Sequence, residues 1–321
     1  MISIVIPSYN SKEYISSCFQ CLQQQTVKDF QAIFIDDGSS DNSIELLNEL
    51  KETASFDMHV YQNEKNLGAG KTRNRGIELS SGDYIMFLDS DDKIDGETIE
   101  KLDSVLSKEH PDCVLFDFYV VKNTMKWLYR TNGTQSIWVN VDDAVLKTNS
   151  SLCGKVYRKK LIVDNLVCFP DLKTNEDFVF NCLALSYCVK IYYMMEPLYY
   201  YIQNPKSVMH SAINKNNDNL ERAFDIIEKT GRFSPQIMTE LAVTKRFYGE
   251  TLTKLALGNK KDDIVRMWES YDVKYVGWEE CKIIQTCPKR MQRALKYIRE
   301  KRYCAFKLFS VFIRIAKKLV R

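Results

Sequence analysis

With 321 residues, the chain is long enough for a catalytic domain of about 200 residues and an accessory region. Hydrophobic residues make up 45% and aromatic residues 12%, which excludes a mainly disordered polymer and indicates a packed core. The net charge of +3 is uneven: residues 289–321 hold twelve Lys and Arg and one acid, so this tail carries +11 and residues 1–288 carry −8. We therefore expect an anionic partner surface at the tail, and no nucleic acid as a partner.

The first 120 residues alternate short apolar runs with amphipathic segments, a pattern typical of β-α-β units. We predict an α/β fold with a mostly parallel central sheet and helices on both faces. The predicted strands cover residues 2–6, 31–35, 59–62 and 84–88, and the predicted helices cover residues 12–25, 43–52 and 71–79.

The pattern farther along the chain predicts more strands at 113–121, 124–129, 189–195 and 199–202. Residues 151–163 are interpreted as a helix or two short turns, and a helix over 178–185 opens at Asn175-Glu176-Asp177. From residue 219 the apolar positions recur with helical spacing. We place an α/β domain at residues 1–215 and a helical region at 216–321.

The ten cysteines are scattered, and the chain opens without the features of a secretory signal, so we expect reduced thiols in the cytoplasm. Cys18 and Cys21 have metal-type spacing, but the sequence lacks a second matching pair. No uninterrupted apolar stretch reaches about 18 residues, so no transmembrane helix is expected.

Polar side chains gather directly after three of the predicted strands, where an open α/β sheet binds ligands. These clusters are Ser8-Tyr9-Asn10, Asp36-Asp37-Gly38-Ser39-Ser40 and Asp89-Ser90-Asp91-Asp92. Residues two apart in an extended segment face the same way, so Asp89 and Asp91 can converge on one ligand. Their oxygens suit Mg²⁺ or Mn²⁺, which completes its shell with diphosphate oxygens and water. The alternative is an Asp-rich turn that caps a helix.

The other clusters suit a nucleotide. One carboxylate of the Asp36-Asp37 pair can accept the imide N–H of uracil while Tyr9 stacks on the ring. Residues 66–76 combine glycines with three cations before a helix, and backbone N–H groups and cations there suit a diphosphate. The glycine spacing does not match a dinucleotide fingerprint.

Five segments together resemble the family 2 glycosyltransferases with the GT-A fold, in that family's order and at its typical intervals. They are Val5-Ile6-Pro7-Ser8-Tyr9-Asn10, Ile35-Asp36-Asp37-Gly38-Ser39, Asn66-Leu67-Gly68 with Arg73-Asn74, Phe87-Leu88-Asp89-Ser90-Asp91-Asp92 and Asn175-Glu176-Asp177. The resemblance covers residues 1–210. It implies inverting transfer of a sugar from a nucleotide-diphosphate donor, with a UDP-sugar favoured, to a lipid-linked or oligosaccharide acceptor of a surface glycan.

Position by position, the resemblance implies a nucleotide-sugar site formed by Pro7, Tyr9, Asp37, Gly68, Arg73 and Asp89. The resemblance also implies that Asp91 and His210 are metal ligands. The alternative for His210 is an ordinary histidine in a surface loop, which fits the sequence equally well. Glu176 is left as an acceptor contact, a metal ligand or a helix cap. Asp177 becomes the general base, since inverting transfer needs one carboxylate to take the acceptor proton across the sugar from the diphosphate.

The tail after residue 305 has apolar residues at helical spacing, Phe306 and Phe309 among them, and cations such as Lys307 on another face. We expect a basic amphipathic helix that holds the protein peripherally at the inner face of the cell membrane. The alternative is a docked terminal helix with a solvated face. Whether the chain forms a homo-oligomer is not decided by the sequence.

Two rival functions stay open. A sugar nucleotidyltransferase is also an α/β protein with a nucleotide site, but its usual glycine-rich turn with Arg directly after the first strand is absent from the sequence. A non-catalytic nucleotide-binding or glycan-binding scaffold is the other alternative. Asp89, Asp91 and Asp177 are all intact, which counts against such a loss of catalysis.

Overall fold

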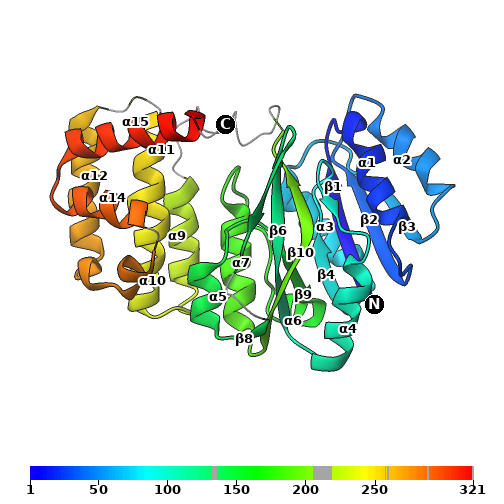
Figure 1. Ribbon diagram of the computed structural model, residues 1–321. Helices are drawn as coiled ribbons and strands as arrows, with labels where there is room; N and C mark the ends of the chain where they lie inside the picture. The colour runs from blue at the N-terminus through cyan, green and yellow to red at the C-terminus, as the bar shows by residue number, and fades with distance from the viewer. Residues whose placement is uncertain (132–135, 205–218, 257, 259, 288, 320–321) are drawn as a thin grey trace. The chain divides into compact units, whose positions relative to one another are not determined.

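A computed structural model describes residues 1–131, 136–204, 219–256, 258, 260–287 and 289–319 (Figure 1). These residues form two compact units. The first contains the described residues up to 204 together with Glu221–Ile227, and the second contains the others. The predicted domain boundary at residue 215 lies outside the described residues and stays a prediction.

The first unit is built on one mixed sheet with strand order β3-β2-β1-β4-β9-β6-β10-β5, in which β7 also pairs with β6 and β8 with β10. Its strands are β1 Ile2–Ser8, β2 Phe30–Asp36, β3 Asp57–Gln62, β4 Tyr84–Phe87, β5 Lys93–Ile94, β6 Cys113–Lys122, β7 Met125–Tyr129, β8 Ile137–Val139, β9 Lys155–Arg158 and β10 Ile191–Ile202. Strands β3, β2, β1 and β4 are parallel neighbours, and β6 is parallel to β10. The predicted α/β class is confirmed.

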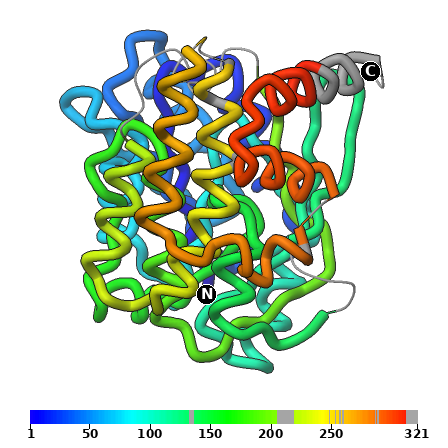
Figure 2. Tube along the Cα trace, turned by 90° about the vertical axis from the view of Figure 1, so that its left-hand side faces the viewer, coloured from blue at the N-terminus to red at the C-terminus, as the bar shows by residue number. Residues whose placement is uncertain are grey.

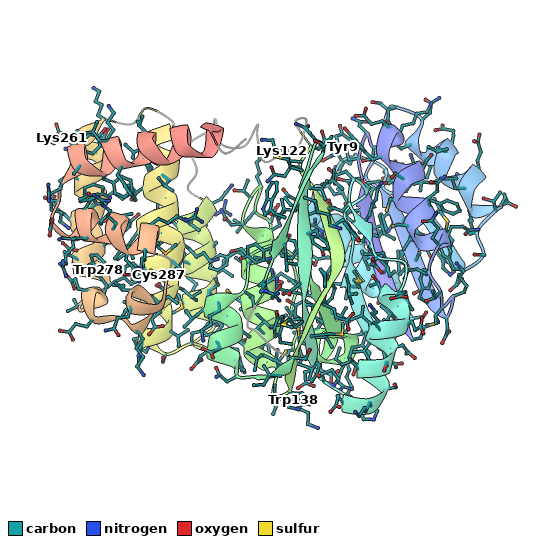
Figure 3. All side chains as sticks on the ribbon, viewed as in Figure 1. Tyr9, Lys122, Trp138, Lys261, Trp278 and Cys287 are labelled. Carbon is teal, nitrogen blue, oxygen red and sulfur yellow. The ribbon has the colours of Figure 1, made fainter. Side chains whose placement is uncertain are left out.

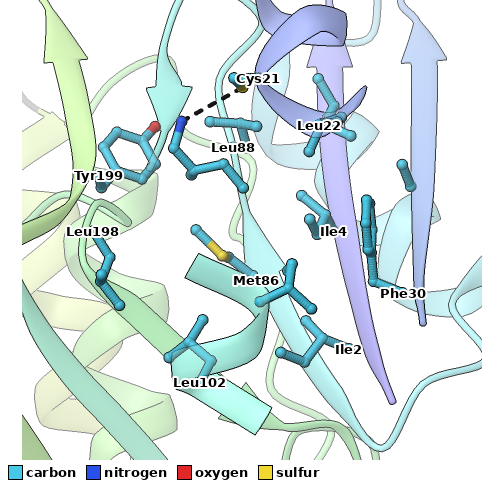
Figure 4. Close-up of a cluster of buried hydrophobic side chains, with 14 of the residues drawn as sticks. Ile2, Ile4, Cys21, Leu22, Phe30, Met86, Leu88, Leu102, Leu198 and Tyr199 are labelled. Carbon is cyan, nitrogen blue, oxygen red and sulfur yellow. Dashed lines mark hydrogen bonds between the residues drawn. The ribbon is translucent and has the colours of Figure 1, made fainter. Parts of the chain in front are cut away.

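Helices cover both faces of this sheet. They are α1 Lys12–Gln23, α2 Ser43–Lys51, α3 Ala69–Leu79, α4 Thr98–Glu109, α5 Val141–Lys147, α6 Lys159–Asp164 and α7 Glu176–Tyr187. Strand β1 is buried on both sides, as its continuous apolar sequence predicts. Ile2 and Ile4 join the core under α1 and α4, with Leu22 and Leu102 (Figure 4).

The other face of β1 packs closely on α3. A Cβ added at Gly76 of α3 would lie 2.2 Å from Val5 Cγ1, so only glycine allows this approach of the helix to the strand. Helix α3 starts after Gly68, whose φ of +89° favours glycine. The two glycines therefore fix where α3 begins and how deep it lies, and with that the position of its polar side chains.

Two predicted elements differ in the structure. Residues 155–158, interpreted as part of a helix or turns, form strand β9, which is paired on both sides with β4 and β6. The interpretation failed because Lys155 and Arg158 interrupt the apolar pattern. The predicted strands at 189–195 and 199–202 are one strand, β10, with register shifts around Pro197. Proline cannot donate a hydrogen bond to the neighbouring strand, which explains the irregularity.

The second unit is helical, as predicted. Its elements are α10 Pro235–Ala242, η1 Val243–Glu250, α11 Thr251–Ala256, α12 Lys261–Lys274, η2 Trp278–Glu280, α13 Lys282–Thr286, α14 Lys289–Arg299 and α15 Tyr303–Leu319, while α9 Asn219–Lys229 spans both units. Its core is aromatic: the Phe247 ring stacks on Tyr271 at 4.4 Å and meets Trp278 edge-on at 4.6 Å. Figure 2 shows α12, α14 and α15 in orange and red.

The predicted apolar face of the tail is divided between the core and the surface. Phe306 is buried against Trp268, with 5.7 Å between ring centroids, so this residue packs on the protein. Leu308 and Val311 are 72% and 44% exposed on α15. The side chains after residue 311 lie outside the described residues. In the described part of the chain, every helix is too short or too polar to span a bilayer.

Candidate active site

Three polar clusters meet at one edge of the sheet, as predicted, because β2, β1 and β4 are parallel neighbours. The backbone extends this pairing past the strands: Asp37 N donates to Ser8 O at 2.8 Å and Leu88 N donates to Val5 O at 3.1 Å. Pro7 is half-buried in β1. Tyr9 directly follows the strand and is 49% exposed, so its ring is available for stacking at this edge.

Asp37 is buried and holds the turn that precedes α3. Its Oδ1 accepts from Asn63 Nδ2 at 2.7 Å and from Leu67 N at 2.9 Å, and its Oδ2 accepts from Gly68 N at 2.8 Å. A carboxylate oxygen can accept two hydrogen bonds, so Oδ2 keeps one acceptor position. Asp37 therefore has a structural role that the sequence did not reveal, beside the predicted contact with uracil.

Arg73 on α3 joins carboxylates that are far apart in the sequence. Its Nη2 donates to Asp89 Oδ1 at 2.7 Å and its Nη1 donates to Asp177 Oδ1 at 2.9 Å. Glu176 Oε1 lies 3.8 Å from Nη1. The Arg73 side chain is only 5% exposed, so its charge is neutralised by these carboxylates rather than by water. One guanidinium thus links the end of β4 to the start of α7.

The surroundings of Arg73 fix its orientation. The guanidinium lies over the Phe169 ring, 5.6 Å from its centroid. The next residue, Asn74, donates to Phe169 O at 2.9 Å and accepts from Phe169 N at 2.8 Å. Two adjacent side chains of α3, Arg73 and Asn74, therefore both contact Phe169. Among the described residues, the buried Nε of Arg73 has no hydrogen-bond partner. Such an atom calls for a water molecule or a ligand oxygen.

Asp177 has an environment suited to proton transfer at neutral pH. Burial raises the pKa of this carboxyl to about 7; Arg73 opposes the rise, and the negative charges of Glu176 and Asp89 add to it. The side chain keeps 26% exposure, so a ligand can still reach it. A carboxylate with a pKa near 7 is a stronger base than an ordinary aspartate and is about half ionised at neutral pH.

The aspartates after β4 divide into accessible and buried groups. Burial raises the pKa of Asp91 to about 6, and the charge of Asp89 adds to this rise. Asp89 is 38% exposed, whereas Asp92 is buried. Asp92 accepts from Tyr199 Oη at 2.6 Å and from Ile202 N at 2.7 Å, which ties the end of β10 to the site. The third aspartate is therefore a structural anchor.

Sequence reasoning missed a buried polar cluster next to Asp177. Lys155 Nζ donates to Asn149 Oδ1 and to Ser151 O, both at 2.7 Å. Asn181, one turn after Asp177 on α7, donates to Ser151 O at 2.9 Å. The positive charge of Lys155 lowers the pKa of Asp177. The signal in the sequence is a lysine inside an apolar run, and the pattern of that run predicts a helix or turns instead of strand β9.

The structure thus brings several predicted site residues to one edge of the first unit: Tyr9, Asp37, Gly68, Arg73 and the three carboxylates around Arg73, which are Asp89, Glu176 and Asp177. His210 lies outside the described residues, so its predicted role as a metal ligand stays a prediction. The described residues contain no group of three or more His, Cys, Asp and Glu side chains arranged around one ion. Any divalent ion at Asp89 and Asp91 therefore needs further ligands from its surroundings.

The sequence and fold match known proteins. The family model described as glycosyl transferase family 2 matches residues 3–162. A relative from Staphylococcus aureus, poly(ribitol-phosphate) beta-N-acetylglucosaminyltransferase TarS, is 29% identical over 208 residues, which cover 62% of this chain and 35% of the relative. The chain thus spans about a third of that protein's length.

Solved structures share the fold. The structure of S. aureus TarS 1–349 in complex with UDP-GlcNAc has a TM-score of 0.76 at 21% identity and covers 98% of this chain and 92% of that one. A mannosyltransferase from Pyrobaculum calidifontis, in complex with GDP-Man and Mn²⁺, has a TM-score of 0.58 at 13% identity, with 99% and 87% of the two chains covered. The predicted GT-A fold is confirmed by the first likeness.

The link from Arg73 to Asp177 predicts an effect on proton affinity. We expect Arg73→Gln to raise the pKa of Asp177 above about 7, because the change removes the positive charge that favours the carboxylate. Carboxyl ¹³C NMR against pH measures this shift. Arg75→Gln is the matched control, since Arg75 donates to Gln62 O and Asn63 Oδ1 instead. An unchanged or lower pKa in Arg73→Gln would contradict the link.

Proposed function

This chain belongs to glycosyl transferase family 2, and we propose that it is an inverting glycosyltransferase that moves a sugar from a UDP-sugar to an acceptor hydroxyl. The observation that carries the proposal is the position of Arg73, 2.7 Å from Asp89 and 2.9 Å from Asp177. It links a donor-side carboxylate to a carboxylate able to take a proton. Inverting transfer needs these two functions on opposite sides of one sugar.

In this proposal Asp177 is the general base. Its carboxylate takes the proton of the acceptor hydroxyl while the acceptor oxygen bonds to the anomeric carbon and the bond to the diphosphate breaks. The pKa near 7 supports this role, because the group is basic enough to accept the proton and is still deprotonated in a large share of molecules. Arg73 and Lys155 favour the ionised form before the acceptor binds.

The donor nucleotide is proposed to lie over the ends of β1 and β2. The exposed Tyr9 ring stacks on uracil beside Pro7, and the remaining acceptor position of Asp37 Oδ2 takes the imide N–H. Gly68, at the start of α3, leaves the backbone open to the diphosphate, and Asp89 approaches the ribose. The buried Arg73 Nε offers a donor for an oxygen of the diphosphate or sugar.

The carboxylates fit a divalent ion, Mn²⁺ or Mg²⁺. Burial and, to a smaller extent, the charge of Asp89 raise the pKa of Asp91, and a bound cation would favour the ionised carboxylate. Oxygen is the donor that both ions prefer. Asp91 and Asp89 would hold the ion, with His210 as a further proposed ligand, and diphosphate oxygens and water would complete the shell. When bound, the ion neutralises charge on the leaving diphosphate. Glu176 stays an acceptor or metal contact.

We propose a surface glycan, lipid-linked or oligosaccharide, as the acceptor, because the name of the S. aureus relative specifies a poly(ribitol-phosphate) acceptor. The matching segment is one part of that longer protein, so the acceptor of this chain needs its own test. Two rivals remain, a sugar nucleotidyltransferase and a non-catalytic scaffold. With added pyrophosphate, a nucleotidyltransferase converts a nucleotide sugar to a nucleoside triphosphate and a sugar phosphate, whereas a scaffold releases nothing. The product therefore identifies the function.

The first experiment is a panel of nucleotide sugars with Mn²⁺, scored by nucleotide release through slow donor hydrolysis. We expect release of UDP, and binding of UDP in preference to GDP or CDP, because Tyr9 and Asp37 fit uracil and cytosine lacks the imide N–H. Calorimetry ranks the three nucleotides. GDP binding most tightly, or no turnover of any sugar nucleotide, would overturn the proposed donor or the proposed activity respectively.

Metal dependence is tested at Asp91. Asp91→Asn should abolish turnover and weaken UDP binding when Mn²⁺ is present, because an amide oxygen lacks the charge that holds the ion. In excess EDTA, the parent protein should lose activity and regain it with Mn²⁺. The control is Asp95→Asn, a partly exposed aspartate in the same segment that accepts from Tyr200 Oη. Full activity in EDTA would exclude the metal from the reaction.

The base is tested at Asp177. Asp177→Asn keeps the size of the side chain but cannot take a proton, so transfer should fall by about 10²–10⁴ while UDP binding survives. In the parent, kcat/KM should rise with pH through about 7 as Asp177 loses its proton, and the variant should lack this rise. Asp171→Asn, at an exposed aspartate paired with Lys71, is the control. Near-normal transfer by Asp177→Asn would show that another residue is the base, and Glu176 would then be the next candidate.

The localisation proposed is peripheral, at the inner face of the cell membrane. Helix α14 exposes Lys289, Arg290, Arg293, Lys296 and Arg299 while Leu295 and Ile298 face the core. Each such cation contributes about 1 kcal/mol near anionic lipid, and the exposed Leu308 adds an apolar contact. The protein should sediment with phosphatidylserine vesicles in low salt and be released by high salt. If the protein does not sediment with these vesicles in low salt, the cationic face of α14 is simply exposed to solvent and does not bind the membrane.

A further inference from the structure

One face of the sheet carries α7, and strand β6 continues beyond that helix on the same face. Tyr157 Oη of β9 donates to Asn181 Oδ1 of α7 at 2.6 Å, so Tyr157 points to the α7 face. Cys113 of β6 pairs directly with Tyr157 and shares its face. Side chains alternate along a strand, so Asp117 and Tyr119 also point to the α7 face. The alternate residues of β6 belong to the core on the opposite face: Val114, Phe116, Phe118 and Val120.

The first turn of α7 lies near the middle of β6. Directly after the helix, Val189 N donates to Asp112 Oδ2 at 2.9 Å, and Asp112 precedes β6, so the helix ends where the strand begins. The 12 residues of α7 rise about 18 Å, which corresponds to at most about five residues of a strand. Asp177 therefore reaches no farther along β6 than about Asp117. Tyr119, two residues later, lies beyond the helix on the same face.

Beyond α7, this face carries two stacked tyrosines and a lysine. Tyr119 of β6 pairs with Tyr200 of β10, and their ring centroids lie 5.5 Å apart. Lys126 of β7 lies over both rings, with its Nζ 3.6 Å from the Tyr119 centroid and 4.6 Å from the Tyr200 centroid. Tyr200 Oη donates to Asp95 Oδ2 at 3.2 Å, which fixes that ring. Because the negative faces of both rings attract the ammonium, its position is defined.

The charge of this surface is positive. Residues 118–131 contain three cations and no acid. Lys126 is exposed and, within the described part of the chain, forms no ion pair. Arg130 Nη1 lies 3.3 Å from Asp117 Oδ2, and the Arg130 side chain is 50% exposed, so it keeps N–H donors that face solvent. We refer to the following four residues as the basic strip: Arg130, Tyr119, Tyr200 and Lys126.

The basic strip begins near the candidate active site. Asp177 is joined through Arg73 to Asp89, which follows β4, and the strand order β4-β9-β6 places β6 two strand spacings, or about 10 Å, away. Figure 3 shows Lys122, the last residue of β6, and Tyr9 at the upper end of the sheet, so the β6–β7 hairpin reaches the same end as the site. A chain molecule with one hydroxyl at Asp177 can therefore reach the basic strip with a neighbouring unit.

We propose that the basic strip is an acceptor subsite that selects glycans with a negatively charged group, a phosphodiester or a carboxylate, on a unit next to the one that receives the sugar; this rests on the proposed function. The Lys126 ammonium has three N–H donors and the rings occupy one side of it, so the other side can bind an anionic oxygen. Because the rings already hold the ammonium in place, little side-chain freedom is lost when the anion binds. A membrane surface with anionic headgroups is the competing partner.

The test compares two lysines of the β6–β7 hairpin. Lys126 pairs with Val121, so Lys122, the next residue of β6, points to the opposite face. Calorimetry with UDP and Mn²⁺ present measures the binding of a phosphodiester-linked glycerol phosphate trimer, trigalacturonate and neutral maltotriose. We expect an anionic trimer to bind more tightly than maltotriose, and Lys126→Gln to raise its Kd by roughly threefold to tenfold. Lys126→Arg, which keeps the charge, should restore most of the affinity, and Lys122→Gln should leave it unchanged.

Each contrary result has a separate meaning. The subsite is overturned if no anionic trimer binds the parent protein more tightly than maltotriose, or if Lys126→Gln and Lys122→Gln have equal effects, which would report only the net charge. Loss of binding to phosphatidylserine vesicles in Lys126→Gln, with trimer affinity intact, would assign the basic strip to lipid and overturn the subsite as well. Absence of donor hydrolysis in the parent would contradict the proposed function, whereas trimer affinity is measured without turnover and is read independently.

Discussion

The site depends on one buried cation, Arg73, placed among three carboxylates. Burial alone would lower the pKa of this guanidinium, but Asp177 and Asp89 more than offset the effect and raise it. A buried arginine without such partners would be strongly destabilising, and without the cation the neighbouring negative charge of Asp89 would disfavour ionisation of Asp177 further. The positive charge of Arg73 and the negative charges of Asp177 and Asp89 therefore stabilise each other. Arg73 keeps Asp177 partly ionised at neutral pH and holds it at a fixed distance from Asp89.

The fold delivers this arrangement through backbone packing. Gly76 lets α3 approach β1, the bonds from Asp37 to Leu67 and Gly68 fix the start of that helix, and Asn74 attaches it to the chain at Phe169. Asp92 ties the end of β10 to the same edge. Many of the polar groups near the site thus serve the fold first. Tyr9, Asp91 and the accessible parts of Asp89 and Asp177 are left for ligands.

Much of this was predictable from sequence, for physical reasons that also set the limit. Strands β1, β2 and β4 are buried on both faces and appear as continuous apolar runs, and parallel pairing then brings Tyr9, Asp37 and Asp89 to one edge. Strand β9 was missed because Lys155 sits in it, buried, with loop oxygens as partners. The contact of Arg73 with Asp177 joins residues 104 apart and has no local signal. The anchoring roles of Asp37 and Asp92 could not be told from ligand binding by residue type alone.

The central claim is that Asp177 acts across the sugar from the departing diphosphate, so that the anomeric carbon is inverted. Donor hydrolysis reports this directly, because the first sugar released keeps the configuration set by the attacking water. With UDP-α-GlcNAc, proton NMR during early turnover should show the β anomer first and the α anomer only later, through mutarotation. Initial release of the α anomer would contradict the placement of the base and the single-displacement mechanism.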